Sequence, residues 1–171
     1  MRTFIIFFLF CFFGISTDAQ FLKTSNAYIS FYSKAPLEDI EAHHYNVDCV
    51  LDTVKNQIAF SARIIDFNFD KKLMKKHFCE KYMEIDDFPF ASFSGQLDFI
   101  NQRNAKVIGE LEIHGQKNKV EVNAYIEKKS NDKIVMKSNF FINLSDYKVK
   151  IPKIVKDNIS KSVEINVIVS F

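Results

Sequence analysis

The sequence is poor in the residues that mark several protein classes. Its 171 residues include no tryptophan, three cysteines, three prolines and four glycines. So few cysteines exclude a small domain built on disulfides, and so little glycine and proline excludes collagen-like and low-complexity chains. The 23 basic and 21 acidic residues nearly balance and are interspersed, so the sequence offers no clustered basic surface for nucleic acid.

Apolar side chains, in contrast, are plentiful. Hydrophobic residues make up 47% of the chain, and there are 19 phenylalanines. This composition is typical of a folded domain with a packed core and excludes intrinsic disorder. A length of 171 residues corresponds to one domain, and no internal repeat or linker divides it.

The first 19 residues have the pattern of a secretory signal peptide. Arg2 precedes an apolar run over residues 4–13, and small residues follow that run. The run is shorter than the roughly 20 residues that a membrane span needs. We therefore expect cleavage after about Ala19, a periplasmic or secreted mature domain over 20–171, and no integral membrane segment.

Alternation of apolar and polar residues dominates the rest of the chain. It places one set of side chains on each face of a strand, so that one face is dry and the other wet. Val107 and Leu111 alternate with charged residues in this way, and Tyr45 and Val47 are expected on the dry face of their strand. The pattern predicts eight strands, at about 27–33, 44–52, 58–64, 91–99, 105–113, 119–127, 134–142 and 163–171.

Two arrangements bury the dry faces of eight strands, a closed barrel or two stacked sheets. Short connections rich in Asn, Asp, Gly and Lys predict that consecutive strands are antiparallel neighbours. A closed barrel leaves no exposed edge, and the long run over 132–144 indicates that it is tall. We therefore predict a mainly β fold, an elongated eight-stranded antiparallel barrel.

Two segments depart from the alternation. Residues 71–84 are predicted to form an amphipathic helix capped by Asp70, and acidic residues after Pro36 predict a short helical turn. The helix is either a flap over one barrel mouth or packed permanently on the barrel. Its lysines either attract an anionic head group or membrane surface, or form a solvated face. The residues concerned are Met74, His77, Phe78 and Tyr82 on one side and Lys71, Lys72, Lys75 and Lys76 on the other.

Small residues on the dry faces bear on whether the barrel is hollow. Gly95, Gly109 and several alanines are too small to fill the axis of a tall barrel, which favours an apolar lumen. Alternatively, large side chains such as Phe60, Phe93 and Phe140 meet in the middle and leave no cavity. A lumen suits an extended lipid, because each buried methylene contributes about 0.8 kcal/mol. Leucine at position 109 is then expected to plug the lumen without unfolding the barrel.

Three stretches resemble the YceI-like family of periplasmic and secreted lipid-binding proteins. They are LMKKHFCEKYMEIDDFPFASFSGQL (73–97), LEIHGQKNKV (111–120) and INLSDYKVKIPKIVKDNISKSVEINVIVSF (142–171). The combination of Phe-Pro at 88–89 with the downstream Leu-x-Ile-His-Gly is the more specific signal. The resemblance implies an elongated lipocalin-like barrel whose interior holds a polyisoprenoid or similar lipid tail, without catalysis.

We accordingly interpret the protein as a non-catalytic binder or carrier of a long apolar lipid, with no cofactor and no metal. The sequence leaves the oligomeric state open, a homodimer included. The residues expected to line the lumen and bind the lipid are Phe60, Ile64, Met74, Phe78, Phe93, Leu97, Val107, Leu111, Val122, Ile126, Met136, Phe140 and Val167.

Two other functions are alternatives. The first is an envelope structural or protein-interaction module with a filled barrel, for which Tyr125, Val135 and Phe141 would form outer apolar patches. The second is a hydrolase or isomerase that uses His114 with a nearby acid. No paired nucleophile and base, no Gly-x-Ser-x-Gly elbow and no Gly-rich phosphate loop supports it, so we expect no enzymatic activity.

The histidines and cysteines have structural interpretations. His114 is expected to pack under the turn formed by the following glycine and to bond a backbone carbonyl. His43 and His44 are adjacent in a strand, so they point to opposite faces and cannot share a metal; both are expected at the surface. Cys49 and Cys79 are expected to be free thiols, since a domain of this size needs no disulfide and no spacing suggests zinc.

Overall fold

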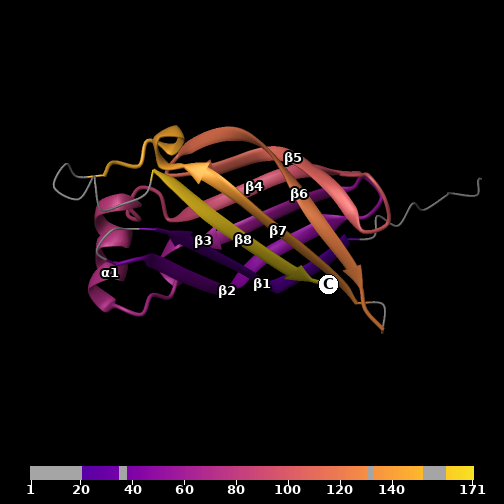
Figure 1. The fold of residues 1–171 in the computed structure, drawn as a ribbon, viewed down its shortest axis with the longest axis horizontal. Helices are drawn as coiled ribbons and strands as arrows, with labels where there is room; N and C mark the ends of the chain where they lie inside the picture. Colours follow the sequence, from indigo (N-terminus) through magenta and orange to yellow (C-terminus); the bar gives the residue numbers. More distant parts are fainter. Residues whose placement is uncertain (1–20, 35–37, 131–132, 152–160) are drawn as a thin grey trace, which may run out of the picture.

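The computed structural model describes residues 21–34, 38–130, 133–151 and 161–171. Each strand is hydrogen-bonded antiparallel to the next, and the eighth returns to the first to close a barrel (Figure 1). This arrangement confirms the predicted fold class and excludes two stacked sheets. The strands are β1 (Phe21–Ser33), β2 (Ile40–Asp52), β3 (Gln57–Arg63), β4 (Phe90–Phe99), β5 (Asn104–Ile113), β6 (Gln116–Lys128), β7 (Ile134–Asn143) and β8 (Ser162–Ser170).

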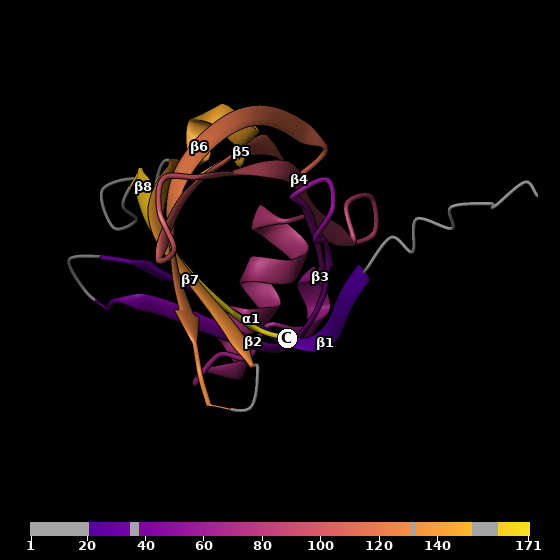
Figure 2. The same cartoon turned by 90° about the vertical axis from the view of Figure 1, so that its right-hand side faces the viewer.

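The barrel is elongated, and its two ends differ. One end, called the helix end here, carries the helical segment between β3 and β4 and the connections β1–β2, β5–β6 and β7–β8 (Figure 1). The other, the turn end, carries the turns β2–β3, β4–β5 and β6–β7 together with Phe21 and Phe171. Seen from the turn end, the helix lies across the far end of the barrel, behind the ring of strands (Figure 2).

Alternation orients most side chains as predicted. In β3, Ile58 and Ala62 are buried while the residues between them are more exposed. Tyr125 and Phe141 are exposed on the outside of the barrel, as expected. Val135, however, is only 5% exposed, so it forms no outer apolar patch.

The middle of β2 departs from simple alternation. Val47 and the inward residues after it are buried as predicted, but Tyr45 is exposed and His44 is buried. In the pairing with β1, Ala27 lies opposite Val47 and Ile29 lies opposite His44, so β2 carries one extra residue. A single extra residue exchanges the two faces of a strand. The expectation that His44 lies at the surface is therefore wrong.

β6 and β7 are paired along only part of their length. The pairing with β7 covers residues 124–128, although β6 begins at Gln116 and pairs with β5 over residues 116–125. Toward the helix end the 3-10 turn η3 (Leu144–Tyr147) contacts both strands, and the Asn118 side chain donates a hydrogen bond of 2.8 Å to the Asp146 carbonyl. The barrel wall at this point is therefore completed by η3.

The segment between β3 and β4 contains the predicted helix in shortened form. A 3-10 turn, η1 (Ile64–Asp66), precedes α1 (Lys72–His77), which continues as a short π-helix, η2 (Phe78–Tyr82). We call α1 and η2 together the cap helix. Its N-cap residue is Lys71, which forms no side-chain capping bond, so the predicted cap at Asp70 is wrong.

The short helical turn expected near Pro36 falls partly on residues 35–37, which lie outside the described residues. Glu41, one of the acids assigned to it, already lies in β2 and is extended. The short helical turns that are described occur instead at η1 and η3. The expected signal peptide, residues 1–19, also lies outside the described residues.

Candidate functional site

The barrel encloses a cavity of about 520 Å³. Inward side chains of all eight strands line it, together with the cap helix and η3, and nearly all of them are apolar. Its deepest lining residues include Ala124, Met136 and Val169. At the helix end the lining includes the exposed residues Lys71 and Leu73, so the cavity reaches the surface beside the cap helix.

The structure places all but two of the sequence-predicted binding residues on the cavity wall. Leu97 and Ile126 are buried in the core but do not line the cavity. Binding of a lipid by the others stays a prediction. Those that line the cavity are Phe60, Ile64, Met74, Phe78, Phe93, Val107, Leu111, Val122, Met136, Phe140 and Val167.

The interior is packed solid toward the turn end. Leu97 and Ile126 belong to one buried cluster with Leu51 and Ala105, and Phe171 packs against it. None of these five side chains lines the cavity. The two interpretations of the lumen therefore each describe one part of the barrel, which is filled at the turn end and hollow toward the helix end.

Four phenylalanines pack against one another between the cap helix and the barrel. The ring centroid of Phe78 lies 5.0 Å from that of Phe69, 5.3 Å from that of Phe31 and 5.9 Å from that of Phe67. Such aromatic pairs contribute about 0.5–1.5 kcal/mol each beyond the area they bury. Phe67 and Phe69 were not among the binding residues predicted from the sequence. They lie in the irregular connection before α1 and follow neither a strand nor a helix period.

Two glycines face each other across β4 and β5. Gly95 and Gly109 are register partners, and the ring of Phe93 lies over both. A Cβ atom at position 109 would lie 2.6 Å from the Cα of Gly95 and 2.6 Å from Phe93 Cζ. The first of these contacts is with backbone, which cannot move aside cheaply. Leucine at position 109 therefore requires these atoms to shift, and the expectation that it plugs the lumen without unfolding the barrel stays a prediction.

Polar and charged lining residues lie in two places, at the helix-end opening and at Lys137 and Ser138 of β7. The Nζ atom of Lys71 lies 2.5 Å from Oε1 of Glu38, an exposed ion pair that links the β1–β2 connection to the start of the cap helix. His77 and Ser33 line the same end of the cavity. Leu73, 64% exposed, lies between lysines of the helix. The opening at the helix end thus combines charged groups with apolar surface, whereas the rest of the wall is apolar apart from Lys137 and Ser138.

The β5–β6 hairpin turns through two residues of positive φ. His114 has φ 52° and Gly115 has φ 67°, as a two-residue type I′ turn requires. Glycine is needed at 115 for a second reason, because a Cβ atom there would lie 2.5 Å from Cε1 of Phe88. The Phe-Pro and His-Gly motifs, far apart in sequence, therefore meet at this turn.

His114 ties this hairpin to the segment that follows the cap helix. Its buried ring packs against Phe88 in a tilted arrangement with a centroid distance of 4.5 Å, and its Nε2 lies 2.7 Å from Oε2 of Glu84. The ring packs under the turn as predicted, but its partner is a carboxylate and not the expected backbone carbonyl. His114 does not line the cavity, so this pair has no access to a molecule bound there.

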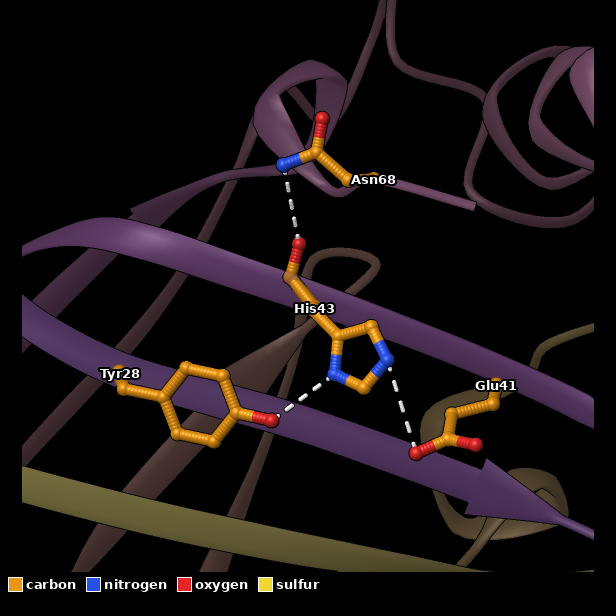
Figure 3. A network of polar contacts seen from close by, with 4 residues as sticks. All are labelled: Tyr28, Glu41, His43 and Asn68. Carbon is orange, nitrogen blue, oxygen red and sulfur yellow. Dashed lines mark hydrogen bonds and ion pairs between the residues drawn. The ribbon is translucent and has the colours of Figure 1, made fainter. Parts of the chain in front are cut away.

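His43 and His44 have different surroundings on the two sides of β2. Half-buried His43 has Nδ1 2.8 Å from the Tyr28 hydroxyl and Nε2 3.5 Å from Oε1 of Glu41 (Figure 3). The Asn68 side chain donates to the His43 carbonyl at 3.2 Å, which joins β2 to the connection before α1 (Figure 3). This network is structural and lies outside the cavity.

His44 is only 1% exposed and packs edge-to-face on Phe67, with a centroid distance of 5.1 Å. Its Nδ1 accepts the backbone N–H of Asn46 at 3.2 Å, and its Nε2 has no hydrogen-bond partner among the described residues. Burial lowers the pKa of His44, outweighing the nearby carboxylates of Asp66 and Asp48, which act to raise it. The ring is therefore held neutral inside the wall.

Both described cysteines are free and buried, as predicted. Burial raises the pKa of Cys49 to about 12 and also raises the pKa of Cys79. Neither is a reactive thiolate, because the nucleophilic form is disfavoured. Among the described residues, no three His, Cys, Asp or Glu side chains come together to hold a metal ion.

The same part of the chain contains no helix long and apolar enough to cross a membrane.

Comparison with known proteins gives a family match and several structural neighbours. The family model described as YceI-like domain matches residues 21–171. No curated protein matches the sequence.

Three solved structures illustrate the likeness of fold. BcnA of Burkholderia cenocepacia is 15% identical, with a TM-score of 0.75 over 85% of this chain and 96% of that one. A polyisoprenoid binding domain from Saccharophagus degradans, implicated in plant cell wall breakdown, is 12% identical, with a TM-score of 0.74 over 86% and 94%. The Campylobacter jejuni YCEI protein is 20% identical, with a TM-score of 0.60 over 81% and 83%. At these identities the likeness concerns the fold alone.

Proposed function

Because the chain belongs to the family of YceI-like domains, we propose that it binds one long apolar lipid of the polyisoprenoid class inside its barrel and catalyses no reaction on it. The observation that carries this proposal is the cavity of about 520 Å³ with an almost wholly apolar wall. Ligand pockets in proteins typically measure about 300–1,000 Å³. The structural likeness to the polyisoprenoid binding domain from Saccharophagus degradans supports the choice of lipid class.

The hydrophobic effect supplies enough free energy for such binding. Each methylene transferred from water contributes about 0.8 kcal/mol, so ten buried methylenes contribute about 8 kcal/mol. Losses of translational and rotational freedom oppose this gain. The affinity then depends on the length of apolar chain that the cavity accepts, and depends little on polar contacts.

The distribution of polar groups sets the direction of the lipid. Glu38, Lys71 and His77 line the cavity at the helix end, and the wall beyond them is apolar except at Lys137 and Ser138 of β7. A lipid with a polar head therefore enters tail first, with the head near the opening and the tail toward Met136 and Val169. A single occupant is expected, because the turn end is closed by packed side chains.

The chemistry of the wall supports binding without catalysis. Ser138 lines the cavity, but its hydroxyl donates to the Asn123 carbonyl at 2.7 Å, and no histidine or carboxylate among the described residues is placed to activate it. A carrier or buffer role in the periplasm or outside the cell agrees with the signal peptide expected at residues 1–19. The alternative of a structural module requires a solid interior, which the hollow part of the barrel does not favour.

A pair of neighbouring substitutions tests the proposal. Val167 lines the cavity near mid-barrel, whereas Ile168 is exposed on the outside. Val167→Trp is expected to fill the lumen and to weaken binding of a polyprenol by tenfold or more, roughly the loss of two buried methylenes. Ile168→Trp, which adds the same ring to the outer face, serves as the matched control.

The measurement is titration with a polyprenol of defined length, followed by native mass spectrometry of the complex. The wild-type protein and Ile168→Trp should each retain one lipid, and Val167→Trp should be largely free of it. Equal uptake by all three proteins, or no uptake by the wild type, would count against the proposal. Thermal unfolding of both variants checks that the barrel is intact.

A further inference from the structure

The turn end carries apolar side chains that nothing in the described structure covers. Phe21 is 52% exposed, Val54 66%, Phe99 49% and Ile100 58%. They come from three separate places, the start of β1, the β2–β3 turn and the β4–β5 turn. Exposed side chains of this size gathered at one end of a molecule indicate a contact surface.

The ladder of strand pairs places these segments around one rim. Phe21 pairs with Asp52 at the edge of the β2–β3 turn, and that turn borders β4 through the bond from the Leu97 N–H to the Asn56 carbonyl. The β4–β5 turn borders β6 in the same way, where the Ile126 N–H donates to the Arg103 carbonyl at 2.7 Å. Viewed along the barrel, the turns surround its end (Figure 2).

Cations lie at the same end of the barrel as these apolar side chains, in or beside the turns β2–β3, β4–β5 and β6–β7. Lys55, Arg103, Lys128, Lys129 and Lys133 are all exposed, and none forms an ion pair with a described residue. We call these five cations, with the four apolar side chains above, the turn-end rim.

Among the described residues, the acids near this end offset little of that charge, and Glu127 of β6 is already paired with Lys137 at 3.7 Å. Asp52 is buried and accepts the backbone N–H groups of Val54 and Lys55, both at 2.9 Å, so its carboxylate shapes the β2–β3 turn. Asp98 is exposed on the outer face of β4. The helix end also exposes lysines, at Lys72, Lys76 and Lys81, but exposed acids of the same segment lie near them and Lys71 is paired with Glu38. These acids are Asp70, Glu80, Asp86 and Asp87.

We propose that the turn-end rim docks on the surface of an anionic lipid membrane. Apolar side chains that insert among head groups, flanked by lysine and arginine, match the two attractions that such a surface offers. In this orientation the turn end of the barrel contacts the membrane, and the cavity opening at the helix end points away from the bilayer. A lipid cargo is then exchanged on the side facing solvent and not directly with the supporting membrane.

Vesicle co-sedimentation tests this surface without any cargo lipid. Purified protein is mixed with vesicles of phosphatidylcholine alone or of phosphatidylcholine with phosphatidylglycerol in equal amounts, at low and at moderate salt. Binding is expected only to the anionic vesicles and is expected to weaken as salt rises. Equal binding to both kinds of vesicle, or binding to neither, would overturn the proposal and leave the cavity function untouched.

Two charge variants locate the contact. Lys55→Gln, Arg103→Gln and Lys128→Gln together are expected to weaken binding roughly hundredfold, since each cation near an anionic surface contributes roughly fivefold. Lys72→Gln, Lys75→Gln and Lys76→Gln remove the same charge from the cap helix and are expected to leave binding unchanged. The reverse result would place the contact at the helix end and refute the proposal.

A third variant tests the apolar part of the contact at constant charge. Val54→Ser with Ile100→Ser removes two exposed side chains and is expected to weaken binding by roughly tenfold. Unchanged binding would mean that the cations alone attract the vesicles and that no side chain inserts, which contradicts docking through this rim. Circular dichroism and thermal unfolding confirm that all three variants are folded.

Discussion

The helix end and the turn end of the barrel use the same alternating sequence pattern for opposite purposes. Toward the turn end, Leu97, Ile126 and their neighbours meet and leave no space. Toward the helix end, the inward side chains line a cavity, β6 and β7 are no longer paired, and η3 and the cap helix complete the enclosure. The comparison teaches that the inward or outward orientation of a residue is a local property, whereas a hollow interior depends on how the whole wall is arranged.

The largest effect should come from truncating equivalent leucines in the two regions. Leu97→Ala removes packing on all sides and is expected to lower the free energy of unfolding by about 2–5 kcal/mol. Leu111→Ala, on the cavity wall, is expected to cost less than about 2 kcal/mol, because part of its side chain already faces empty space. Chemical denaturation of both variants measures the difference. Equal losses would mean that the two regions are packed alike.

A smaller difference is expected in the reactivity of the two buried cysteines. Cys49 lies in a continuous strand, whereas Cys79 lies in the cap helix, where it is the one fully buried side chain. Local opening of a segment with few buried contacts costs less than opening of a sheet. Among variants that retain a single cysteine, the one with Cys79 should therefore react with a thiol reagent about tenfold faster than the one with Cys49.

Cargo lipid sharpens this test. A lipid lying beneath the cap helix should slow the labelling of Cys79 and leave that of Cys49 unchanged. Faster labelling of Cys49 would show that the strands open before the helix does, and that the ends differ in shape but not in local stability.

The smallest effect concerns acid. The pKa of His44 is lowered in the folded protein, so the unfolded chain binds more protons than the folded one below about pH 6.5. The stability that the neutral ring provides is therefore complete above that pH and declines as the pH falls. Denaturation of the wild type and of His44→Gln at neutral and mildly acidic pH measures the effect, and the variant should lose less. An identical pH dependence in the two proteins would mean that His44 does not contribute to the loss of stability in acid.

Much of the fold could be predicted from the sequence because strand alternation is a local signal. The eight strands and most inward positions follow directly from it. Tyr45 and His44 could not be assigned correctly, since a single extra residue in one pairing exchanges the faces and leaves no trace in composition. The cap helix was placed correctly, but its start at Lys72 without a side-chain cap contradicts the expectation at Asp70.

Most residues that line the cavity could be predicted from the sequence, but the point at which the cavity ends could not. Inward residues such as Phe93 and Leu111 line the cavity as expected. Nothing in the sequence indicated that packing at Leu97 would end the cavity. Phe67 and the Glu84 partner of His114 lie in irregular segments, whose long-range contacts arise only when the chain is folded. The Phe-Pro and His-Gly motifs indicated a family from the sequence, but their contact at the β5–β6 turn was not predicted.

The facing glycines of β4 and β5 have a consequence for which molecules the barrel admits. With no side chain at either position, the Phe93 ring lies close to both residues. A methyl group at either position would clash with this ring and with the backbone of the facing strand, so the ring or the strands would have to shift. The two glycines thus help to set the width of the cavity. Relatives with larger residues at this pair should accept lipids of a different width.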